Sequence, residues 1–294
     1  MLYGAAEVPA LAVSLANPVL GSEPRLETWQ GEAPVVRSRS GSIELAEDGT
    51  LLAGSTSRPL GQDVEGATFD LYRELLASTA ERGYPGLLRL WNYLPGINRI
   101  EAGEELYWHF NAGRARAFAG HYGSEMERRY CASSAVGGRG DELVTYFLAA
   151  REEGHHIENP RQVSAWCYPP SYGPVSPTFA RATVAPPALG SALFLSGTAS
   201  IVGHQTRHAG DLLAQLEETL VNIEAVLAAA APWRPRPDRL EDLDALKVYL
   251  RHPEDLSVVQ AALERRLPDG KEVLYLEAEI CRPDLAIEIE GIAL

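Results

Sequence analysis

The stretch "GDLLAQLEETLVNIEAVLAAAAP", residues 210–232, decides the fold, because it carries the clearest periodic pattern in the chain. Its apolar side chains recur at the three- and four-residue spacing that lines one face of an α-helix. They are Leu212, Leu213, Leu216, Leu220, Ile223, Val226 and Leu227. Asp211 can cap the first turn and Pro232 cannot continue the helix, so the pattern marks both ends.

Strands and a second helix are predicted on either side of this helix. Residues 191–204 are apolar, β-branched and interrupted by glycine, and residues 245–251 alternate with a period of two. Residues 253–267 repeat the helical spacing, while 271–281 and 284–291 predict two strands joined by a tight Arg-Pro-Asp turn. The predicted order is strand, helix, strand, helix, strand, strand.

The N-terminal half predicts the same order of elements. They are strands within 42–57, a helix at 67–83, a strand at 86–94, a helix at 104–121, and strands at 129–138 and 142–151 around a Gly-Arg-Gly-Asp hairpin turn. Two copies of one α+β unit, residues 1–155 and 156–294, explain this repeat better than one irregular domain. Each mixed sheet would carry helices on one face, leaving the other to pack against the second copy or form a cleft.

The segment between the halves, residues 159–190, has an unusual composition for a linker. It holds seven prolines and four aromatic residues, together with Arg161 and Arg181. Flexible linkers are rich in glycine, serine and charge, so this stiff segment predicts an ordered stretch that lines something. Its parts 162–168 and 179–185 could pair as strands.

Composition excludes several classes of function. The net charge of -14 argues against a general surface for nucleic acid or anionic membrane. Three cysteines without paired spacing indicate a reducing compartment, and the first 25 residues fit neither a signal peptide nor a membrane span. A cytoplasmic protein is expected. Arginine supplies nearly all its positive charge, since lysine occurs only at Lys247 and Lys271.

The usual motifs for metals, nucleophiles and phosphates are absent from the sequence. His204 and His208 are four residues apart, but no third ligand is spaced near them. Ser196 and Ser200 lack the spacing of a nucleophile elbow, and "GGRGD" at 137–141 lacks the strand-to-helix context of a phosphate loop. The sequence predicts no metal and no cofactor.

Carboxylates and arginines remain as candidates for chemistry. Arg114 lies four positions from both Phe110 and Phe118, so it projects from the core-facing side of its helix and needs an anionic partner or ligand. On the last strand, Glu288 and Glu290 share the face opposite Ile287 and Ile289. A solvated strand face explains Glu288 alone; a catalytic glutamate is the alternative.

Several motifs, taken in order, resemble the chorismatase family. They are "NYLPGIN", "FNAGRARAF", "NPRQVSAWCYP…YGPVSPTFARA", "LFLSGTASIVGH", "GDLLAQLEETLVNI" and "AEICRPDLAIEIEG", which run from about residue 91 to the end. The resemblance implies two fused units like those of RidA and bacterial chorismate mutase. It also implies cofactor-free conversion of chorismate to hydroxybenzoate or dihydroxycyclohexadienoate products plus pyruvate. Residues 1–60 match no motif of the family, and the first unit is expected to be short.

The resemblance also assigns residues. Glu288 matches the family's catalytic glutamate, which protonates the enolpyruvyl ether. Arg114 and Tyr168 match substrate-binding positions, and Arg161 and Arg181 are weaker candidates for holding the two carboxylates of chorismate.

Cys281 and Gly197 match positions that accompany 3-hydroxybenzoate formation in the family. The alternatives are a mixed 3-/4-hydroxybenzoate synthase, a hydrolytic chorismatase, a non-catalytic RidA-like carboxylate-binding protein and an imine deaminase. The oligomeric state stays open between a self-associating assembly and a monomer with pseudo-trimer-like internal packing.

Overall fold

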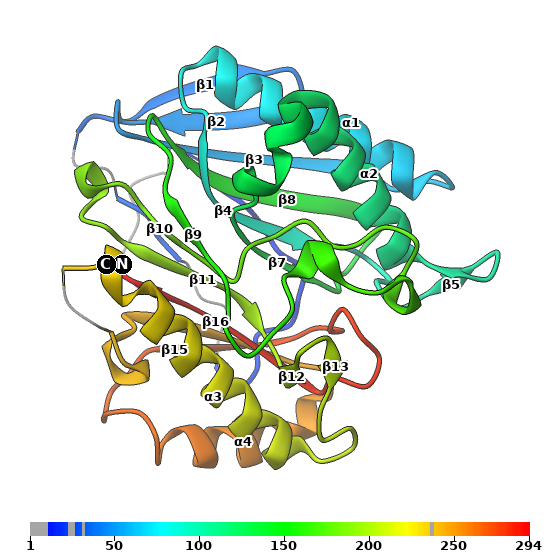
Figure 1. The fold of residues 1–294 in the computed structure, drawn as a ribbon, viewed down its shortest axis with the longest axis vertical. Coiled ribbons are helices and arrows are strands. Elements are labelled where there is room, and N and C mark those ends of the chain that lie inside the picture. Colours follow the sequence, from blue (N-terminus) through cyan, green and yellow to red (C-terminus); the bar gives the residue numbers. More distant parts are fainter. Residues whose placement is uncertain (1–10, 23–26, 31–32, 236–237) are drawn as a thin grey trace.

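The computed structural model describes residues 11–22, 27–30, 33–235 and 238–294. The sequence predicts that the first 25 residues are neither a signal peptide nor a membrane span. Of these residues, 1–10 and 23–25 lie outside the described part. Two six-stranded sheets dominate the structure (Figure 1). Within the described ranges, none of the helices is both long and apolar enough to cross a membrane.

The first sheet has the strand order β1-β2-β3-β8-β4-β7. Its elements are β1 (Val36–Ser40), β2 (Ile43–Glu47), β3 (Leu51–Pro59), α1 (Val64–Glu81), β4 (Gly86–Tyr93), α2 (Leu106–Tyr122), β7 (Ala132–Val136) and β8 (Glu142–Ala150). A small hairpin, β5 (Ile100–Glu101) and β6 (Glu104–Glu105), precedes α2. β4 and β7 run parallel, and the other neighbours are antiparallel.

The second sheet repeats this topology in the order β9-β10-β11-β16-β14-β15. Its elements are β9 (His155–Ile157), β10 (Ala182–Val184), β11 (Leu193–Thr198), α3 (Leu212–Ala230), β14 (Ala245–Leu250), α4 (Leu256–Leu263), β15 (Val273–Glu277) and β16 (Ile287–Ala293). β12 (Ile201–Val202) and β13 (Gln205–Thr206) form a separate hairpin. β14 and β15 are again the parallel pair, so the predicted mixed sheets and their duplication are confirmed.

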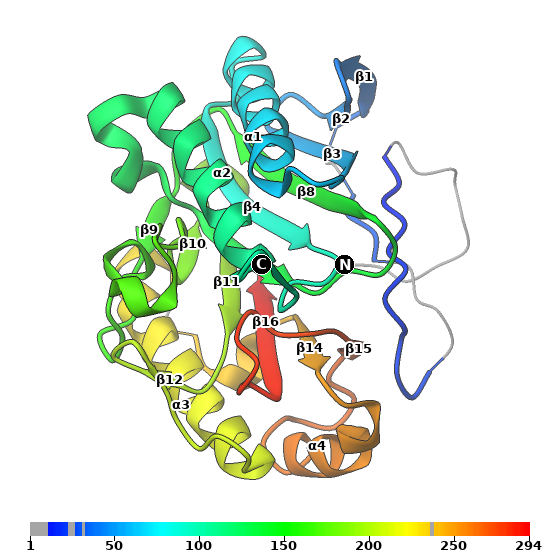
Figure 2. The ribbon, with the colours of Figure 1, turned by 90° about the vertical axis from the view of Figure 1, so that its right-hand side faces the viewer.

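The layers follow from where each helix places its apolar face. α1 and α2 cover the outer face of the first sheet, α3 and α4 cover the outer face of the second, and the two sheets face each other between them (Figures 1 and 2). A third apolar cluster, including Trp91, Tyr93, Phe194 and Tyr249, fills the space between the sheets. The α+β class with helices on one face of each sheet is confirmed.

The helix predicted at residues 210–232 is α3, and its N-terminal cap and its end are those that the sequence predicts. Asp211 caps α3 by accepting a hydrogen bond from the backbone N–H of Ala214 at 3.0 Å. Leu216, Leu220 and Ile223 on its apolar face are fully buried against the second sheet. The helix ends at Ala230, two residues before Pro232, because proline has no N–H to continue the ladder.

The sequence predicts a hairpin turn between β7 and β8 and a tight turn that joins β15 to β16, but neither pair of strands is adjacent in its sheet. β7 and β8 do not pair across the Gly-Arg-Gly-Asp segment, because β4 lies between them. β15 and β16 are likewise separated by β14, although the Arg-Pro-Asp turn itself exists, with Leu285 N–H bonded to Arg282 O at 3.1 Å. In both units a helix crossover places a parallel strand at the sheet edge, and the final strand then inserts in the middle.

Two strand predictions also need correction. The segment 191–204 is not one strand: β11 ends at Thr198, the chain bends at Ser200, and β12 begins at Ile201 in a separate hairpin. The segment 162–168 forms no strand with 179–185: it is irregular around a 3-10 turn at Ala165–Cys167, and β10 pairs with β9 and β11 instead.

The last strand, β16, is not half solvated as its alternation suggests. All seven of its residues are buried. Ile287 and Ile289 pack in the helix-covered core, while Glu288 and Glu290 face the other sheet. A strand that is central in its sheet and covered on both faces buries both sets of side chains, charged ones included.

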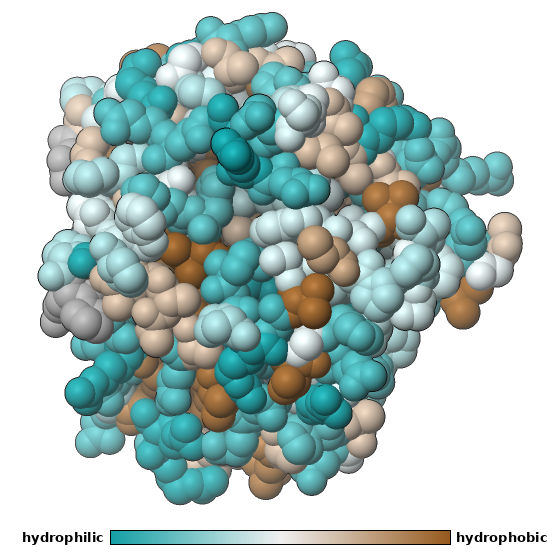
Figure 3. Space-filling model, viewed as in Figure 1, coloured by the Kyte–Doolittle hydropathy of each residue, from teal (hydrophilic) through white to brown (hydrophobic). Residues whose placement is uncertain are grey.

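The outer surface in the view of Figure 3 is largely hydrophilic, with hydrophobic residues in small scattered groups. This agrees with the charged composition of the chain.

Candidate active site

A pocket of about 380 Å³ opens where the two units meet. Five structural parts line it: the start of α2, the segment 162–181, the end of β11 with the residues after it, the loop 281–284, and β16. The lining residues are Glu105, Tyr107, Trp108, Gln162, Tyr168, Ser171, Tyr172, Pro177, Phe179, Arg181, Gly197, Ala199, Ile201, Cys281, Arg282, Pro283, Asp284 and Glu288. The prediction that the proline-rich segment is ordered and lines something is therefore confirmed.

β16 carries two glutamates, and of these only Glu288 is among the described residues that line this pocket. The residue is 4% exposed and makes no hydrogen bond or ion pair with any described residue. Burial, followed by the negative charge of Glu290, raises the pKa of Glu288 to about 8, against the opposing effect of Arg89. Its carboxyl group is therefore mainly protonated at neutral pH and can serve as a proton donor.

Two buried arginines line the same pocket. Arg181 donates to the phenol oxygen of Tyr168 at 2.8 Å, and Arg282 stacks over Tyr172 with its Cζ 4.0 Å from the ring centroid. Nε of Arg181 and Nη2 of Arg282 are buried without a hydrogen-bond partner among the described residues. Buried guanidinium donors of this kind require acceptors, which a small anionic ligand can supply.

The loop that carries Cys281 and Arg282 is braced by one guanidinium group. Arg251 donates to the carbonyl oxygens of Ile280 at 3.1 Å, Arg282 at 2.8 Å and Leu285 at 2.8 Å. Three backbone acceptors on one rigid fork leave the loop little freedom to move. The pocket wall at Arg282 is therefore pre-organised.

Gly197 lies where the pairing of β11 with β16 shifts register, next to Glu288. A Cβ on Gly197 would lie 1.9 Å from Glu288 Oε1 and 3.0 Å from Ser134 Oγ, so the absence of a side chain makes room for the carboxyl group. Across the pocket, burial and then Glu288 raise the pKa of the Cys281 thiol to about 12, which keeps it neutral. Both residues present small apolar surfaces near the proton donor.

The structure brings together five of the seven predicted site residues: Tyr168, Arg181, Gly197, Cys281 and Glu288. Arg114 and Arg161 do not line the pocket.

Arg114 is 2% exposed and donates to Ser133 Oγ at 3.1 Å, while its guanidinium lies over Tyr72 at 5.1 Å. Its Nε and Nη2 lack partners among the described residues, so the expected anionic partner is not a described side chain. Arg161 instead binds Glu218 at 2.6 Å and Asn222 Oδ1 at 2.5 Å on α3.

Sequence reasoning missed Arg282, Tyr107, Trp108 and Tyr172. Arg282 was identifiable only as part of a turn, and its position directly after Cys281 was the available signal. Tyr107 and Trp108 sit at the start of the helix that carries Arg114, but a single helix pattern does not reveal which residues face a second unit.

No group of three or more His, Cys, Asp or Glu side chains within the described ranges is placed to hold a metal ion. The pocket instead combines a protonated carboxyl group with two guanidinium groups at the interface between the two units. This arrangement defines a class of site: an acid catalyst for a small anionic compound.

Comparisons with known proteins show which family of proteins this chain resembles. The family "Chorismatase FkbO/Hyg5-like, N-terminal" matches residues 27–149. A 3-hydroxybenzoate synthase of Streptomyces hygroscopicus is 37% identical over 97% of this chain and 86% of its own length, and a chorismatase of the same organism is 38% identical over 90% and 78%. A chorismatase crystal structure at 37% identity superposes with a TM-score of 0.84 over 89% of this chain and 80% of that one. The chain belongs to the chorismatase family.

The family match also corrects one expectation. It begins at residue 27, so residues 27–60, in which the sequence shows no recognisable motif of the family, belong to its N-terminal part. In the structure, β1, β2 and β3 lie in this region. Short strands with weak alternation carry little local signal that distinguishes one family from another.

Proposed function

We propose that this chain converts chorismate to 3-hydroxybenzoate and pyruvate, with Glu288 as the catalytic acid. The observation that carries the proposal is the buried, protonated carboxyl group of Glu288 in a pocket that also contains Arg181 and Arg282. Chorismate has two carboxylates and an enol ether. The pocket offers guanidinium groups for the former and a proton for the latter.

The first step is proton transfer from Glu288 to the methylene carbon of the enolpyruvyl group. The C=C bond supplies the electron pair, and the product is an oxocarbenium ion beside the Glu288 carboxylate. Arg181 and Arg282 hold the substrate carboxylates and fix the methylene carbon within reach of the acid. Tyr168, already bonded to Arg181, adds a phenol to this side of the pocket.

The second stage decides the product. If the substrate's own hydroxyl adds to the cation, its oxygen forms a C–O bond to the side chain and its proton passes to the Glu288 carboxylate. The bond between that oxygen and the ring then breaks, and the side chain leaves as pyruvate carrying that oxygen. Loss of the proton from the ring carbon that keeps the ether oxygen aromatises the ring, and a proton ends on the new 3-hydroxyl. No water is consumed, because chorismate equals 3-hydroxybenzoate plus pyruvate in atoms. If water enters instead, a dihydroxycyclohexadienoate forms. Cys281 and Gly197 leave apolar surface beside Glu288, which favours the route without water.

The direct test is incubation of the purified protein with chorismate, with pyruvate measured enzymatically and the ring product identified by mass and retention. We expect 3-hydroxybenzoate with one pyruvate per turnover. A product heavier by one water indicates the hydrolytic route, and a mixture with 4-hydroxybenzoate indicates the mixed synthase. Binding of chorismate without pyruvate release would contradict the proposal and favour a carboxylate-binding protein. Ammonia release from an amino-acid-derived imine would favour a deaminase.

The pH dependence of kcat should follow the protonation of Glu288. The pKa of this group is raised to about 8 by burial, so the acid form dominates below that pH and is lost above it. We therefore expect kcat to be level below pH 8 and to fall about tenfold for each further pH unit. A rate that rises with pH over this interval would contradict a proton donor.

Arg282→Met should weaken substrate binding more than it slows chemistry. The variant removes a buried guanidinium that lines the pocket, and a charge-assisted hydrogen bond of this kind is worth a rise in KM of about 10- to 100-fold. Arg207→Met removes an exposed arginine from the neighbouring hairpin and is the matched control. Equal KM values for the two variants would show that Arg282 does not hold the substrate.

The domain boundary at residues 155 and 156, the oligomeric state and the cytoplasmic location stay predictions. The boundary between residues 155 and 156 falls within β9 (His155–Ile157), the first strand of the second sheet, five residues after β8 ends at Ala150. The location is supported by three cysteines that are all free.

A further inference from the structure

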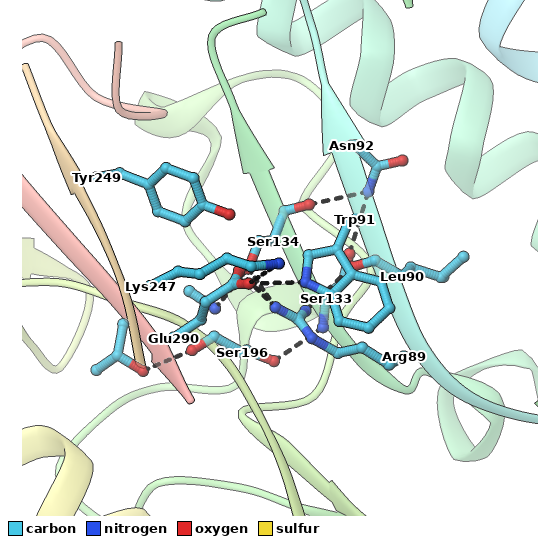
Figure 4. Close-up of polar contacts among 12 residues, drawn as sticks. Arg89, Leu90, Trp91, Asn92, Ser133, Ser134, Ser196, Lys247, Tyr249 and Glu290 are labelled. Atoms are coloured by element: carbon cyan, nitrogen blue, oxygen red, sulfur yellow. Dashed lines mark hydrogen bonds and ion pairs between the residues drawn. The ribbon is translucent and has the colours of Figure 1, made fainter. Parts of the chain in front are cut away.

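Glu290 lies in a buried cluster of charged side chains between the two sheets. Its carboxylate accepts hydrogen bonds from Arg89 at 2.7 Å, the indole of Trp91 at 2.7 Å and the hydroxyl of Ser134 at 2.5 Å. Lys247 Nζ lies 3.4 Å away. Figure 4 shows these side chains converging on Glu290 from β4, β7 and β14.

These partners keep Glu290 ionised. Burial alone would raise the pKa of Glu290, but Arg89 and Lys247, with the hydrogen bonds from Ser134 and Trp91, bring it below its ordinary value. Lys247 is in turn bound to Glu27 at 2.7 Å. The charges of Arg89, Lys247, Glu27 and Glu290 sum to zero. Each of these groups forms an ion pair within the cluster, so the cluster carries no net charge.

Two structural links connect Glu290 to the proton donor. Glu288 and Glu290 are two residues apart on one face of β16, so their backbone positions are about 7 Å apart. Ser134 provides the second link, because its Oγ accepts the N–H of Gly197 at 2.9 Å while donating to Glu290. Gly197 is the residue whose missing side chain leaves room for Glu288.

We propose that Glu290 is a positioning residue whose permanent negative charge holds the proton on Glu288 and whose bond to Ser134 keeps Gly197 clear of it. The proposal rests on the proposed function, in which Glu288 is the acid. It deepens that function by assigning a role to the second glutamate of the strand, which makes no contact with the pocket itself.

Other titratable groups face Glu288 as well, and their charges must be counted. Tyr249 lies opposite it in β14, and burial raises the pKa of this phenol well above its ordinary value. Tyr107 on α2 and Cys281 have pKa values raised mainly by burial, so both are neutral. The other charged side chains around this site are the cations Arg89, Arg114, Arg181, Arg251, Arg282 and Lys247 and the anions Glu27, Glu105, Asp284 and Glu290. Among these anions, Glu290 is the one that shares a strand face with Glu288 and raises its pKa.

The test compares kcat against pH for pyruvate release by four proteins: wild type, Glu290→Gln, Lys247→Met and the double variant. Glu290→Gln removes the anion, so the pH at which activity falls should move down by about 1 unit or more. Lys247→Met removes a cation, so it should move that pH up. The double variant restores the balance and should lie near the wild type.

A purely structural role would give a different result. Glu290→Gln would then lower kcat by the same factor at every pH, and the pH at which kcat begins to fall would be the same as in the wild type. This outcome overturns the proposal. If Glu290→Gln does not fold, as judged by thermal unfolding, the upward shift in Lys247→Met decides: a shift supports the proposal and an unmoved limb overturns it. Glu272→Gln removes an exposed charge as the control and should match the wild type.

Failure of the proposed function is separable from failure of this inference. A wild-type protein that releases no pyruvate from chorismate contradicts the function itself. A wild-type protein that is active, with variants whose limbs coincide, contradicts only the role of Glu290.

Discussion

Glu288→Gln is expected to fold normally and to lose pyruvate release from chorismate by about 100- to 10,000-fold. Glutamine has the same shape but no proton to give to the methylene carbon, and the enol ether cannot break without that proton. The pocket walls and Arg181 and Arg282 are unchanged, so chorismate should still bind. The measurement is kcat for pyruvate release, together with the dissociation constant of chorismate by calorimetry.

Glu279→Gln is the matched control for this variant. Glu279 is exposed and lies near the loop that carries Cys281, so the variant changes the same functional group outside the pocket. Wild-type turnover by Glu288→Gln would show that another group donates the proton. A loss of binding as well as of turnover would show that the glutamate holds the substrate rather than protonating it.

Gly197→Ala is expected to reduce kcat by about 100-fold, because it displaces the catalytic carboxyl group by more than an ångström. The new methyl carbon would lie 1.9 Å from Glu288 Oε1 in the present arrangement, far inside contact distance. Ser134 Oγ stands 3.0 Å away on another side, so the methyl group has little room to move. Glu288 must rotate instead, away from the position that the substrate geometry requires.

The product of Gly197→Ala carries further information. A displaced carboxyl group opens space for water, so the dihydroxycyclohexadienoate should increase relative to 3-hydroxybenzoate in chromatography of the reaction mixture. Gly120→Ala is the control, since a Cβ at this helical position on α2 meets no described atom within 4 Å. An unchanged rate and product ratio in Gly197→Ala would contradict the close approach of Gly197 to Glu288.

Local sequence patterns predicted much of the secondary structure. The helices α1, α2 and α3 and the strands β2, β4 and β14 were each marked by periodicity, caps or flanking glycine and proline. The order of elements also revealed the duplication, since the two units repeat it. Strand pairing was predicted less well. In both units a third strand lies between the two strands that a predicted turn connects, because the sheet order depends on crossovers between residues far apart in sequence.

The candidate site was predicted from family motifs more than from physical patterns. Those motifs led to Glu288, Tyr168, Arg181, Gly197 and Cys281, all of which line the pocket. Alternation alone favoured a solvated Glu288, because a period of two distinguishes the faces of a strand but not what covers them.

The sequence by itself determined the elements, their duplicated order and the presence of a carboxylate and arginines suited to a small anion, because these depend on residues close together in the chain. Only the tertiary structure decided that Glu288 is protonated, that Arg282 joins it, and that Glu290 is balanced by Arg89 and Lys247. The pKa of a carboxyl group depends on burial and on charges within a few ångströms. Here those charges come from strands up to 201 residues away, which meet only when the two sheets pack face to face.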